Sequence, residues 1–475
     1  YICADDKEQI YHPYFSYQGF QYVQIVSYPG KVKPEDFTAC VIHTAMDRTG
    51  EFSCSNELVN QLHHNILWGM KGNFLDVPTD CPQRDERLGW TGDAQIFCRT
   101  ASYLMDTDVF YRKWLADVRA GQTEDGGIPH VVPDVFKGKA TIGNKVYMGT
   151  HSAAGWADAG GIVPWTLYKM YGDTGVIKIQ YQSMKSWIDF MYTHAEDGMW
   201  KYKRQFGDWV ALDAEEGSYY GATPIELTNM AYYAYSTGLF AKMARVIGKK
   251  EDADRYEKLY EEIKDSYKRH FFTEEGRLSV QTQTAQILSL SFDLVPEEYK
   301  RNVINDLLIL LEKENGHLVT GFMGTPYFCQ ALSENGHTKE AYELLLKEDY
   351  TSWLYQVKQG GTTIWEHWDG KKPDGSMWSP EMNSFNHYAY GAVGEWLYRQ
   401  VAGIECGKDV GGFQKIEFIP QIETFKYAGA SYESIYGKIV SSWRREKEKV
   451  YWEVEVPCNT TATLYAYKAK EMIET

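Results

Sequence analysis

The chain has 475 residues, enough for about three domains or for one large domain with smaller companions. It carries 49 Lys and Arg against 65 Asp and Glu, which gives a formal net charge of −16. Such an acidic chain would repel a phosphate backbone, so nucleic-acid binding is excluded as its main function. Apolar residues make up 44% and charged residues 24% of the chain, a composition typical of folded globular proteins.

The longest apolar runs, such as Leu307–Leu311, are far shorter than the roughly 20 residues that cross a bilayer, so we expect no membrane span. The eight cysteines form neither a C-x-x-C pair nor a zinc-like spacing, which argues against a disulfide scaffold and a zinc site. The first residue is Tyr1 rather than Met. We therefore expect a fragment or a processed form, with any targeting segment upstream.

Residues 1–48 predict β-strands. Tyr14–Tyr28 is rich in Tyr, Phe, Val and Ile and alternates polar with apolar positions, Pro29 and Gly30 break the pattern, and Ala39–Ala45 follows as a second short strand. Two or three strands do not make a stable sandwich by themselves. We therefore expect a truncated N-terminal β-domain, whose other strands are missing or come from elsewhere in the chain.

Residues 49–405 switch to helical periodicity. Apolar side chains recur every four residues from Leu58 to Met70, behind a candidate N-cap at Ser55. Tight turns such as Gly172-Asp173 favour antiparallel helix pairs, and about a dozen paired helices predict an (α/α)6 barrel. The rival architecture, a solenoid, lacks support because no fixed-period repeat is present. The predicted helices lie near 55–71, 92–104, 107–121, 152–171, 174–195, 222–247, 251–270, 281–291, 296–313, 322–334, 338–347 and 384–402.

Residues 406–475 return to strand patterns and predict a small C-terminal β-sandwich. The fold class is therefore mainly α, with an (α/α)6-barrel catalytic domain flanked by β-sandwich elements. The predicted strands are Ile416–Ile419, Tyr436–Trp443, Val450–Val456 and Thr461–Tyr467.

Four long connections in the helical region are rich in Gly, Trp and carboxylates. Long loops without periodicity inside a compact domain are typically functional. Because polar and Trp-rich segments concentrate in these loops, while the helices carry the apolar stripes, we predict that the loops meet at one mouth of the barrel. They are residues 73–91, 121–150, 196–220 and 355–380.

The densest polar stretch is Asp76–Asp93, which holds five carboxylates, two arginines and Trp90. One interpretation is a solvated loop whose charges pair at the surface. The stretch, however, interleaves its charges with Pro, Gly and Trp, and can hold several carboxylates beside an aromatic ring. A sugar site needs this arrangement, because carboxylates accept hydrogen bonds from hydroxyls, Trp packs on the sugar ring, and a carboxylic acid protonates the leaving oxygen.

A second cluster is Gly360–Asp369, in which Glu366 lies between Trp365 and Trp368 with His367 beside it. Apolar walls raise the pKa of a carboxyl group and neighbouring cations lower it, so this environment can tune a catalytic group. The alternative is that both Trp side chains belong to the core and Glu366 is a surface residue.

Weaker clusters pair Trp with Asp near helix ends, in Gly155–Asp158 (GWAD) and Phe206–Trp209 (FGDW), or place His387 at the start of the last helix. Sequence motifs for zinc proteases, serine hydrolases, P-loops and dinucleotide-binding folds are absent from the printed sequence. Two-carboxylate chemistry without a cofactor or a metal is therefore the main candidate.

The run Gly72–Gln95 (GNFLDVPTDCPQRDERLGWTGDAQ) closely resembles the central motif of bacterial α-L-rhamnosidases of glycoside hydrolase family 78. GWAD, FGDW, Gly361–Gly370 (GTTIWEHWDG) and Asn386–Val393 (NHYAYGAV) resemble later motifs of that family in the same order. The resemblance covers roughly residues 10–470. It implies an (α/α)6-barrel domain between β-domains, and hydrolysis of terminal α-L-rhamnosides with inversion.

By position, the resemblance implies that Glu86 is the general acid and Glu366 the general base. Neighbouring Asp80 and Asp85 also disfavour a further negative charge on Glu86, which suits an acid. The family further implies a rhamnose-containing glycan or glycoside as substrate, and favours the bacterial periplasm or cell surface. The residues that the resemblance assigns to the sugar subsite are Asp80, Arg84, Trp90, Asp93, Trp156, Trp209 and His387.

Two other functions stay open. A different (α/α)6-barrel glycosidase could act on another sugar with the same carboxylate pair. A non-catalytic carbohydrate-binding protein could use the aromatic residues to stack sugars. The presence of both Glu86 and Glu366 argues against the second alternative, because a protein that only binds needs neither.

Overall fold

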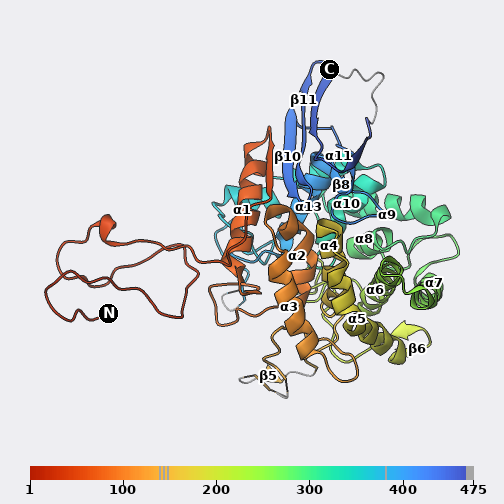
Figure 1. Ribbon diagram of the computed structural model, residues 1–475, viewed down its shortest axis with the longest axis horizontal. Coiled ribbons are helices and arrows are strands. Elements are labelled where there is room, and N and C mark those ends of the chain that lie inside the picture. The colour runs from red at the N-terminus through yellow and green to blue at the C-terminus, as the bar shows by residue number, and fades with distance from the viewer. Residues whose placement is uncertain (138–140, 143–144, 147–148, 380–381, 467–475) are drawn as a thin grey trace.

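The computed structural model describes residues 1–137, 141–142, 145–146, 149–379 and 382–466. Paired helices form a barrel, β-strands from the end of the chain cover one end of it, and the first residues trail away from the body of the molecule (Figure 1). Among the described residues, no helix has the length and apolar character needed to cross a membrane.

The inner wall of the barrel is a closed ring of helical elements, each packed against the next, and the last packs against the first. The predicted (α/α)6 barrel is thereby confirmed. In ring order the inner elements are α2 (Thr91–Leu104), α4 (Ala159–Tyr171), α6 (Ile225–Val246), α8 (Gln283–Ser291), η3 (Thr325–Tyr327) with α10 (Phe328–Glu334), and the last run of η4 (Ala389–Val393), α13 (Gly394–Trp396) and η5 (Leu397–Val401).

Most outer helices pack against this ring and alternate with it along the chain, although the last two outer helices follow each other without an inner element between them. Burial distinguishes the two layers. α6 is buried along nearly its whole length, whereas α7 buries one stripe, including Tyr256, Ile263 and Tyr267, and exposes its charged face. The outer helices are α1 (Glu57–Asn73), α3 (Asp108–Gly121), α5 (Gly175–Thr193), α7 (Lys250–Phe271), α9 (Lys300–Lys313, preceded by η2, Glu297–Tyr299), α11 (Thr338–Leu345) and the unpredicted α12 (Trp353–Lys358).

The strands predicted for residues 1–48 are wrong for this structure. Residues 1–47, all of them described, contain no strand, and only the short turn η1 (Pro34–Asp36) is regular. Apolar side chains such as Tyr22 and Val26 are exposed. A strand needs a neighbour to complete its hydrogen bonds, and no strand among the described residues pairs with this segment.

The C-terminal strands form two sheets, with strand orders β1-β10-β11-β12 and β13-β9-β8. The four predicted strands correspond to β9, β11, β12 and β13, although Tyr467 lies outside the described residues. β1, β8 and β10 were not predicted. The bounds are β1 (Gly50–Cys54), β8 (Ile404–Cys406), β9 (Lys415–Phe418), β10 (Tyr427–Ser434), β11 (Gly437–Glu446), β12 (Lys449–Glu455) and β13 (Thr461–Leu464).

β1 precedes the barrel in sequence but belongs to the C-terminal sheet. It pairs antiparallel with β10, from Gly50 opposite Tyr432 to Cys54 opposite Ala428. The chain thus enters and leaves the barrel on the same side. Small two-stranded ribbons decorate the loops: β2 (Phe74–Leu75) with β3 (Val77–Pro78), β4 (Thr141–Ile142) with β5 (Lys145–Val146), and β6 (Ala195–Glu196) with β7 (Met199–Trp200).

Strand β8 and the loop after it cover the end of the barrel where the inner helices finish. Glu405 accepts hydrogen bonds from Arg99 of α2 and Arg399 of η5. The Lys169 ammonium, in the last turn of α4, donates to the carbonyl oxygens of Gly407 (2.5 Å) and Val410 (2.6 Å). We call this end, defined by these residues, the closed end.

Candidate active site

The candidate site lies at the opposite end, where the inner helices begin. Asp93 is in the first turn of α2, Trp156 shortly precedes α4, and Trp209 lies in the loop before α6. Glu366 and His387 lie between α12 and η4. We call this end the polar mouth. As predicted, the four long loops meet there. Trp90 forms a β-bridge with Val131, and its ring lies 6.0 Å from that of Phe206. Arg84, from the same loop as Trp90, donates a hydrogen bond to Glu366.

Arg84 joins the two glutamates that the sequence selected. Its Nη2 lies 2.7 Å from Glu86 Oε2 and its Nε donates to the same oxygen at 2.8 Å. Its Nη1 and Nη2 donate to the two oxygens of Glu366, at 2.7 and 3.1 Å. One guanidinium therefore bridges both carboxylates, although they lie far apart in the chain.

The two glutamates differ in their exposure. The Glu366 side chain is 2% exposed and that of Glu86 is 28% exposed. Burial raises the pKa of Glu366, but the charge of His387 and the hydrogen bonds and charge of Arg84 outweigh it and lower this pKa to about 2. Glu366 is therefore ionised throughout the neutral range.

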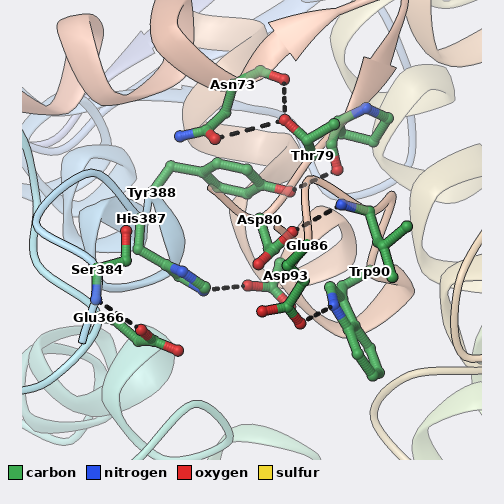
Figure 2. A network of polar contacts seen from close by, with 12 residues as sticks. Asn73, Thr79, Asp80, Glu86, Trp90, Asp93, Glu366, Ser384, His387 and Tyr388 are labelled. Carbon is green, nitrogen blue, oxygen red and sulfur yellow. Dashed lines mark hydrogen bonds and ion pairs between the residues drawn. The ribbon is translucent and has the colours of Figure 1, made fainter. Parts of the chain in front are cut away.

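The backbone fixes Glu366 as firmly as its side chain does. The Ser384 amide donates to Glu366 Oε2 at 2.8 Å, and the Glu366 amide donates to the Ser384 carbonyl at 2.8 Å. Figure 2 shows the first of these contacts, with the carboxylate facing the group formed by Asp93, Asp80 and Glu86.

His387 and Asp93 form a buried ion pair. Nε2 of His387 lies 2.6 Å from Asp93 Oδ1, and both side chains are 4% exposed (Figure 2). Burial lowers the pKa of His387, but the charge and hydrogen bond of Asp93, with the charges of Glu366 and Asp80, raise it to about 9. The imidazole is therefore a cation at neutral pH, and its buried Nδ1 has no partner among the described residues.

Asp80 lies deeper than the other carboxylates. Its Oδ1 accepts a hydrogen bond from the Leu88 amide at 2.9 Å, while its Oδ2 is buried 3.6 Å from Arg84 Nη2 without a hydrogen bond. Burial raises the pKa of Asp80, as does the charge of Glu86, while His387 opposes the shift, and the result is a pKa of about 7. By contrast, the neighbouring Asp85 is fully exposed and pairs with Arg87 at 3.5 Å, so it lies outside the site.

An aromatic wall adjoins the carboxylates. The Trp90 indole donates to Glu86 Oε1 at 2.9 Å (Figure 2). The centroid of the Trp90 ring lies 6.0 Å from that of Phe206, which itself lies 4.6 Å from Trp156 and 5.7 Å from Trp209. Phe206 begins the FGDW motif but was not among the predicted site residues. Its ring links the three predicted tryptophans.

Gly92 allows Trp156 to reach the first turn of α2. A Cβ atom at Gly92 would lie 2.6 Å from the Trp156 indole, too close for any side chain. The glycine between Trp90 and Asp93 is therefore required by packing. It brings an aromatic face against the helix start that carries Asp93.

The aspartates of the two short motifs are structural. Asp158 is buried and accepts hydrogen bonds from Trp187 (3.0 Å) and Ser236 (2.6 Å). Asp208 is buried and accepts from the amides of Gly321 and Met323, each at 2.8 Å. Each aspartate thus fixes the backbone that places its motif's Trp.

A second aromatic series, not predicted from the sequence, runs from Trp209 to His367. Trp209 stacks on Tyr219 with centroids 5.1 Å apart, Tyr219 lies 5.3 Å from Trp378, and Trp378 stacks on His367 at 4.1 Å. His367 is the direct neighbour of Glu366. Trp378 lies in the predicted loop 355–380 but outside its GTTIWEHWDG motif, so the sequence indicated its loop and not the residue.

One group of potential metal ligands occurs among the described residues. The ligand atoms of Asp80, Cys81 and Glu86 lie within 4.8 Å of one another. Burial raises the pKa of the Cys81 thiol far above its usual range, and Arg84 already occupies Glu86. This group does not fit a metal site, because it offers a neutral thiol and a carboxylate neutralised by a guanidinium. Metal-free chemistry stays a prediction.

The ring of paired helices and the loops at its polar mouth define a six-hairpin domain of the glycosidase class: residues 47–401 match the bacterial alpha-L-rhamnosidase 6 hairpin glycosidase domain. Residues 403–474 match the C-terminal domain of the same proteins, and residues 1–43 match their concanavalin-like domain. The chain therefore belongs to the bacterial α-L-rhamnosidase family.

Among curated relatives, an alpha-L-rhamnosidase of Streptomyces avermitilis is 39% identical over 98% of this chain, which spans 43% of the relative's length. The solved structure of the Streptomyces avermitilis enzyme complexed with L-rhamnose has a TM-score of 0.82 and 39% identity, over 89% of this chain and 39% of that one. The structure of an Aspergillus terreus alpha-L-rhamnosidase has a TM-score of 0.84 and 35% identity, over 89% of this chain and 48% of that one. The chain thus spans less than half the length of these relatives.

Proposed function

We propose that this chain carries the catalytic site of an α-L-rhamnosidase, which releases terminal α-L-rhamnose from rhamnose-containing glycosides with inversion of configuration. The observation that carries the proposal is the Arg84 bridge between Glu86 and Glu366, two carboxylates in different environments at one mouth. The likeness to a structure complexed with L-rhamnose supports the choice of sugar.

The environments support different roles for the two glutamates. Inversion needs a donor on the leaving-group side and a base that activates water on the opposite face of the sugar. Glu86 is the more exposed carboxylate, which suits a donor to a leaving group that departs into solvent. Glu366 is buried and ionised, which suits the base, because a glutamate accepts the proton of water only in its ionised form.

The remaining residues supply a subsite for a hydroxyl-rich ring. Asp80 and Asp93 accept hydrogen bonds from hydroxyl groups, and the free Nδ1 of cationic His387 donates one. Trp90, Trp156 and Trp209 offer apolar faces for the C–H groups of the ring. The subsite is therefore proposed to comprise all seven residues that the sequence assigned to it: Asp80, Arg84, Trp90, Asp93, Trp156, Trp209 and His387.

The division of the chain also remains a proposal: an N-terminal β-domain segment at 1–48, the barrel at 49–405 and a C-terminal β-sandwich at 406–475. The matched ranges 1–43, 47–401 and 403–474 support it. The pairing of β1 with β10 assigns one strand before the barrel to the C-terminal sheet.

Two measurements test the function. A panel of nitrophenyl glycosides should give turnover with the α-L-rhamnoside and little with other sugars. Faster turnover of another sugar would favour the alternative glycosidase, and no turnover of any would favour a carbohydrate-binding protein. NMR of the first-formed product should then show β-L-rhamnose. Retention of the α configuration before mutarotation would reject inversion and make Glu366 a nucleophile.

The acid role has its own test. Glu86→Gln should lose roughly 10²–10³-fold in kcat/KM on a rhamnoside with a poor leaving group. The loss should be much smaller on the nitrophenyl substrate, because nitrophenolate hardly needs protonation. Equal losses on both substrates would contradict the assignment of Glu86 as the acid.

A further inference from the structure

A cavity separate from the polar mouth lies between the inner elements of the ring, towards the closed end. Its volume is about 180 Å³, and its lining comes from all six inner elements of the ring. The lining includes Arg99 of α2, Lys169 of α4 and Arg399 of η5, which lie towards the ends of those elements. Glu334, whose side chain is 52% exposed, marks where the cavity meets solvent.

Several buried polar atoms on its lining have no partner among the described residues. They are Gln95 Oε1, Gln330 Oε1, Ser291 Oγ and Arg99 Nε. Gln95 is 3% exposed and Gln330 is 7% exposed. A buried polar atom without a hydrogen bond costs about 1–3 kcal/mol, so four of them around one cavity call for a polar occupant.

The orientation of the two amides leaves acceptors rather than donors free. The Gln95 Nε2 donates to the Gly155 carbonyl at 2.9 Å, and the Gln330 Nε2 donates to Glu334. Each amide nitrogen is thus used, and each amide oxygen is not. Together with the Ser291 hydroxyl and the Arg99 N–H, the cavity offers both acceptors and donors, which hydroxyl groups satisfy in either role.

The charges around the cavity are already paired. Arg99 and Arg399 both bind Glu405, Arg399 also binds Glu395 at 3.0 Å, and the Lys169 ammonium is bound by backbone carbonyls. Among the described lining residues, each of these charged groups therefore already has ion-pair or hydrogen-bond partners. The free groups are mainly neutral, so the cavity favours an uncharged polar molecule.

Aromatic rings supply the rest of the lining. Tyr235 stacks on Phe292 with centroids 4.1 Å apart, and Trp165 and Tyr327 complete the wall. Aromatic faces beside hydrogen-bonding groups suit a ring that carries both C–H faces and hydroxyls. The volume limits its size, because drug-sized ligands occupy about 300–1,000 Å³.

We propose that this cavity is a second, non-catalytic site for one neutral monosaccharide. The first candidate is the L-rhamnose that the polar mouth is proposed to release, and this clause alone rests on the proposed function. The alternative occupant is a cluster of about six ordered waters, at roughly 30 Å³ each.

Isothermal titration of the whole chain with L-rhamnose, D-glucose and L-fucose tests the proposal, together with a crystal soaked in the sugar that binds. The expected result is two sites for at least one sugar, with density for a pyranose ring in the cavity. Binding of another neutral monosaccharide but not L-rhamnose supports the cavity site and removes its link to the product. A single site for every sugar, with only waters in the cavity, overturns the proposal.

Matched variants assign the two sites. Gln330→Met keeps the side-chain length and removes the acceptor, so it should weaken the cavity site at least tenfold while kcat/KM on a nitrophenyl rhamnoside stays within twofold. Trp90→Ala should weaken the mouth site and leave the cavity site intact. Ser291→Leu reduces the volume of the cavity, and it is the alternative variant if Gln330→Met lowers the melting temperature. Retention of two undiminished sites in both cavity variants, folded by circular dichroism, also overturns the proposal.

Discussion

The two ends of the barrel are built from the same ionic groups in opposite arrangements. At the polar mouth, Arg84 lies between Glu86 and Glu366. At the closed end, Glu405 lies between Arg99 and Arg399. The inner helices begin at the mouth and finish at the closed end, so their dipoles favour carboxylates at the first and cations at the second.

The difference between the ends lies in what covers them. Strand β8 carries Glu405 into the closed end, where its neighbours shield it, and the charges of the two arginines lower its pKa to about 2 against the effect of burial. At the mouth, no strand within the described residues covers the charges, and Glu86 remains partly exposed. A satisfied ion cluster thus joins domains at one end, whereas an accessible one is available to a substrate at the other.

The largest expected effect is on kcat, which should depend on Glu366 at the mouth and not on Glu405 at the closed end. Glu366→Gln should lower kcat by roughly 10³–10⁴-fold, because a general base is lost. Glu366→Ala should lose as much and regain part of its activity with azide, which attacks without deprotonation. The matched variant at the other end, Glu405→Gln, should keep kcat within about threefold at a temperature where it is folded. Equal losses of kcat in both variants would end the distinction.

The free energy of unfolding should depend more on Glu405, at the closed end, than on Glu366, at the mouth. Glu405→Gln should lower the free energy of unfolding by up to about 3–5 kcal/mol, because two half-buried arginines lose their shared anion. Because the pKa of Glu405 is lowered in the folded state, its contribution is present above about pH 4.5, its usual pKa, and is lost as the pH falls through about 2. Urea unfolding should therefore show that the difference in free energy of unfolding between wild type and variant is smaller near pH 3 than at pH 7. A difference that is larger near pH 3 would contradict the pairing.

Arg84→Met sharpens the comparison at the mouth. Loss of the guanidinium removes a group that lowers the pKa of Glu366, so this pKa should rise and the base should become protonated at a higher pH. We expect kcat/KM to fall about 10–100-fold, with the acidic limb of its pH profile moved to higher pH. The profile checks the mechanism, since a loss of activity with an unmoved acidic limb would limit Arg84 to binding the sugar.

Trp90→Phe should have the smallest effect. The ring remains, but its hydrogen bond to Glu86 is lost, so we expect a loss of about 1 kcal/mol, or roughly fivefold in kcat/KM. Trp90→Ala should cost about 1–3 kcal/mol with a strong rise in KM, because packing and water exclusion are lost too. Kinetics unchanged in the alanine variant, confirmed folded, would make Trp90 a purely structural residue.

The sequence predicted the barrel and the polar mouth well for a physical reason. Inner and outer helices differ in how much of their circumference is apolar, and this pattern is local, as in α6 against α7. The mouth was readable because its carboxylates crowd into one loop, Asp76–Asp93, and one short motif around Glu366. Their roles remain predictions until the variants above are measured.

Other features depended on contacts between distant segments. The N-terminal residues have strand composition but no partner strand in the described part of the chain, so the strands that the local pattern predicts are not formed in this structure. Glu405 gave no signal, because its meaning comes from Arg99, which is far away in the chain. Phe206 stood beside a motif that was read for its Asp and Trp, and only the fold reveals that its ring contacts three tryptophans.

The pairing of β1 with β10 has a consequence for synthesis on the ribosome. Gly50 emerges early, but its partner Tyr432 comes near the end of the chain, and at about 5–20 residues per second the delay is on the order of tens of seconds. Until these later residues are made, β1 has no neighbouring strand, and Arg99 of α2 and Lys169 of α4 lack the partners that Glu405 and Gly407 provide. Nascent chains released early should therefore depend on chaperones, and a stop codon shortly before Ile404 would leave a barrel that is complete in its helices yet uncovered at its closed end.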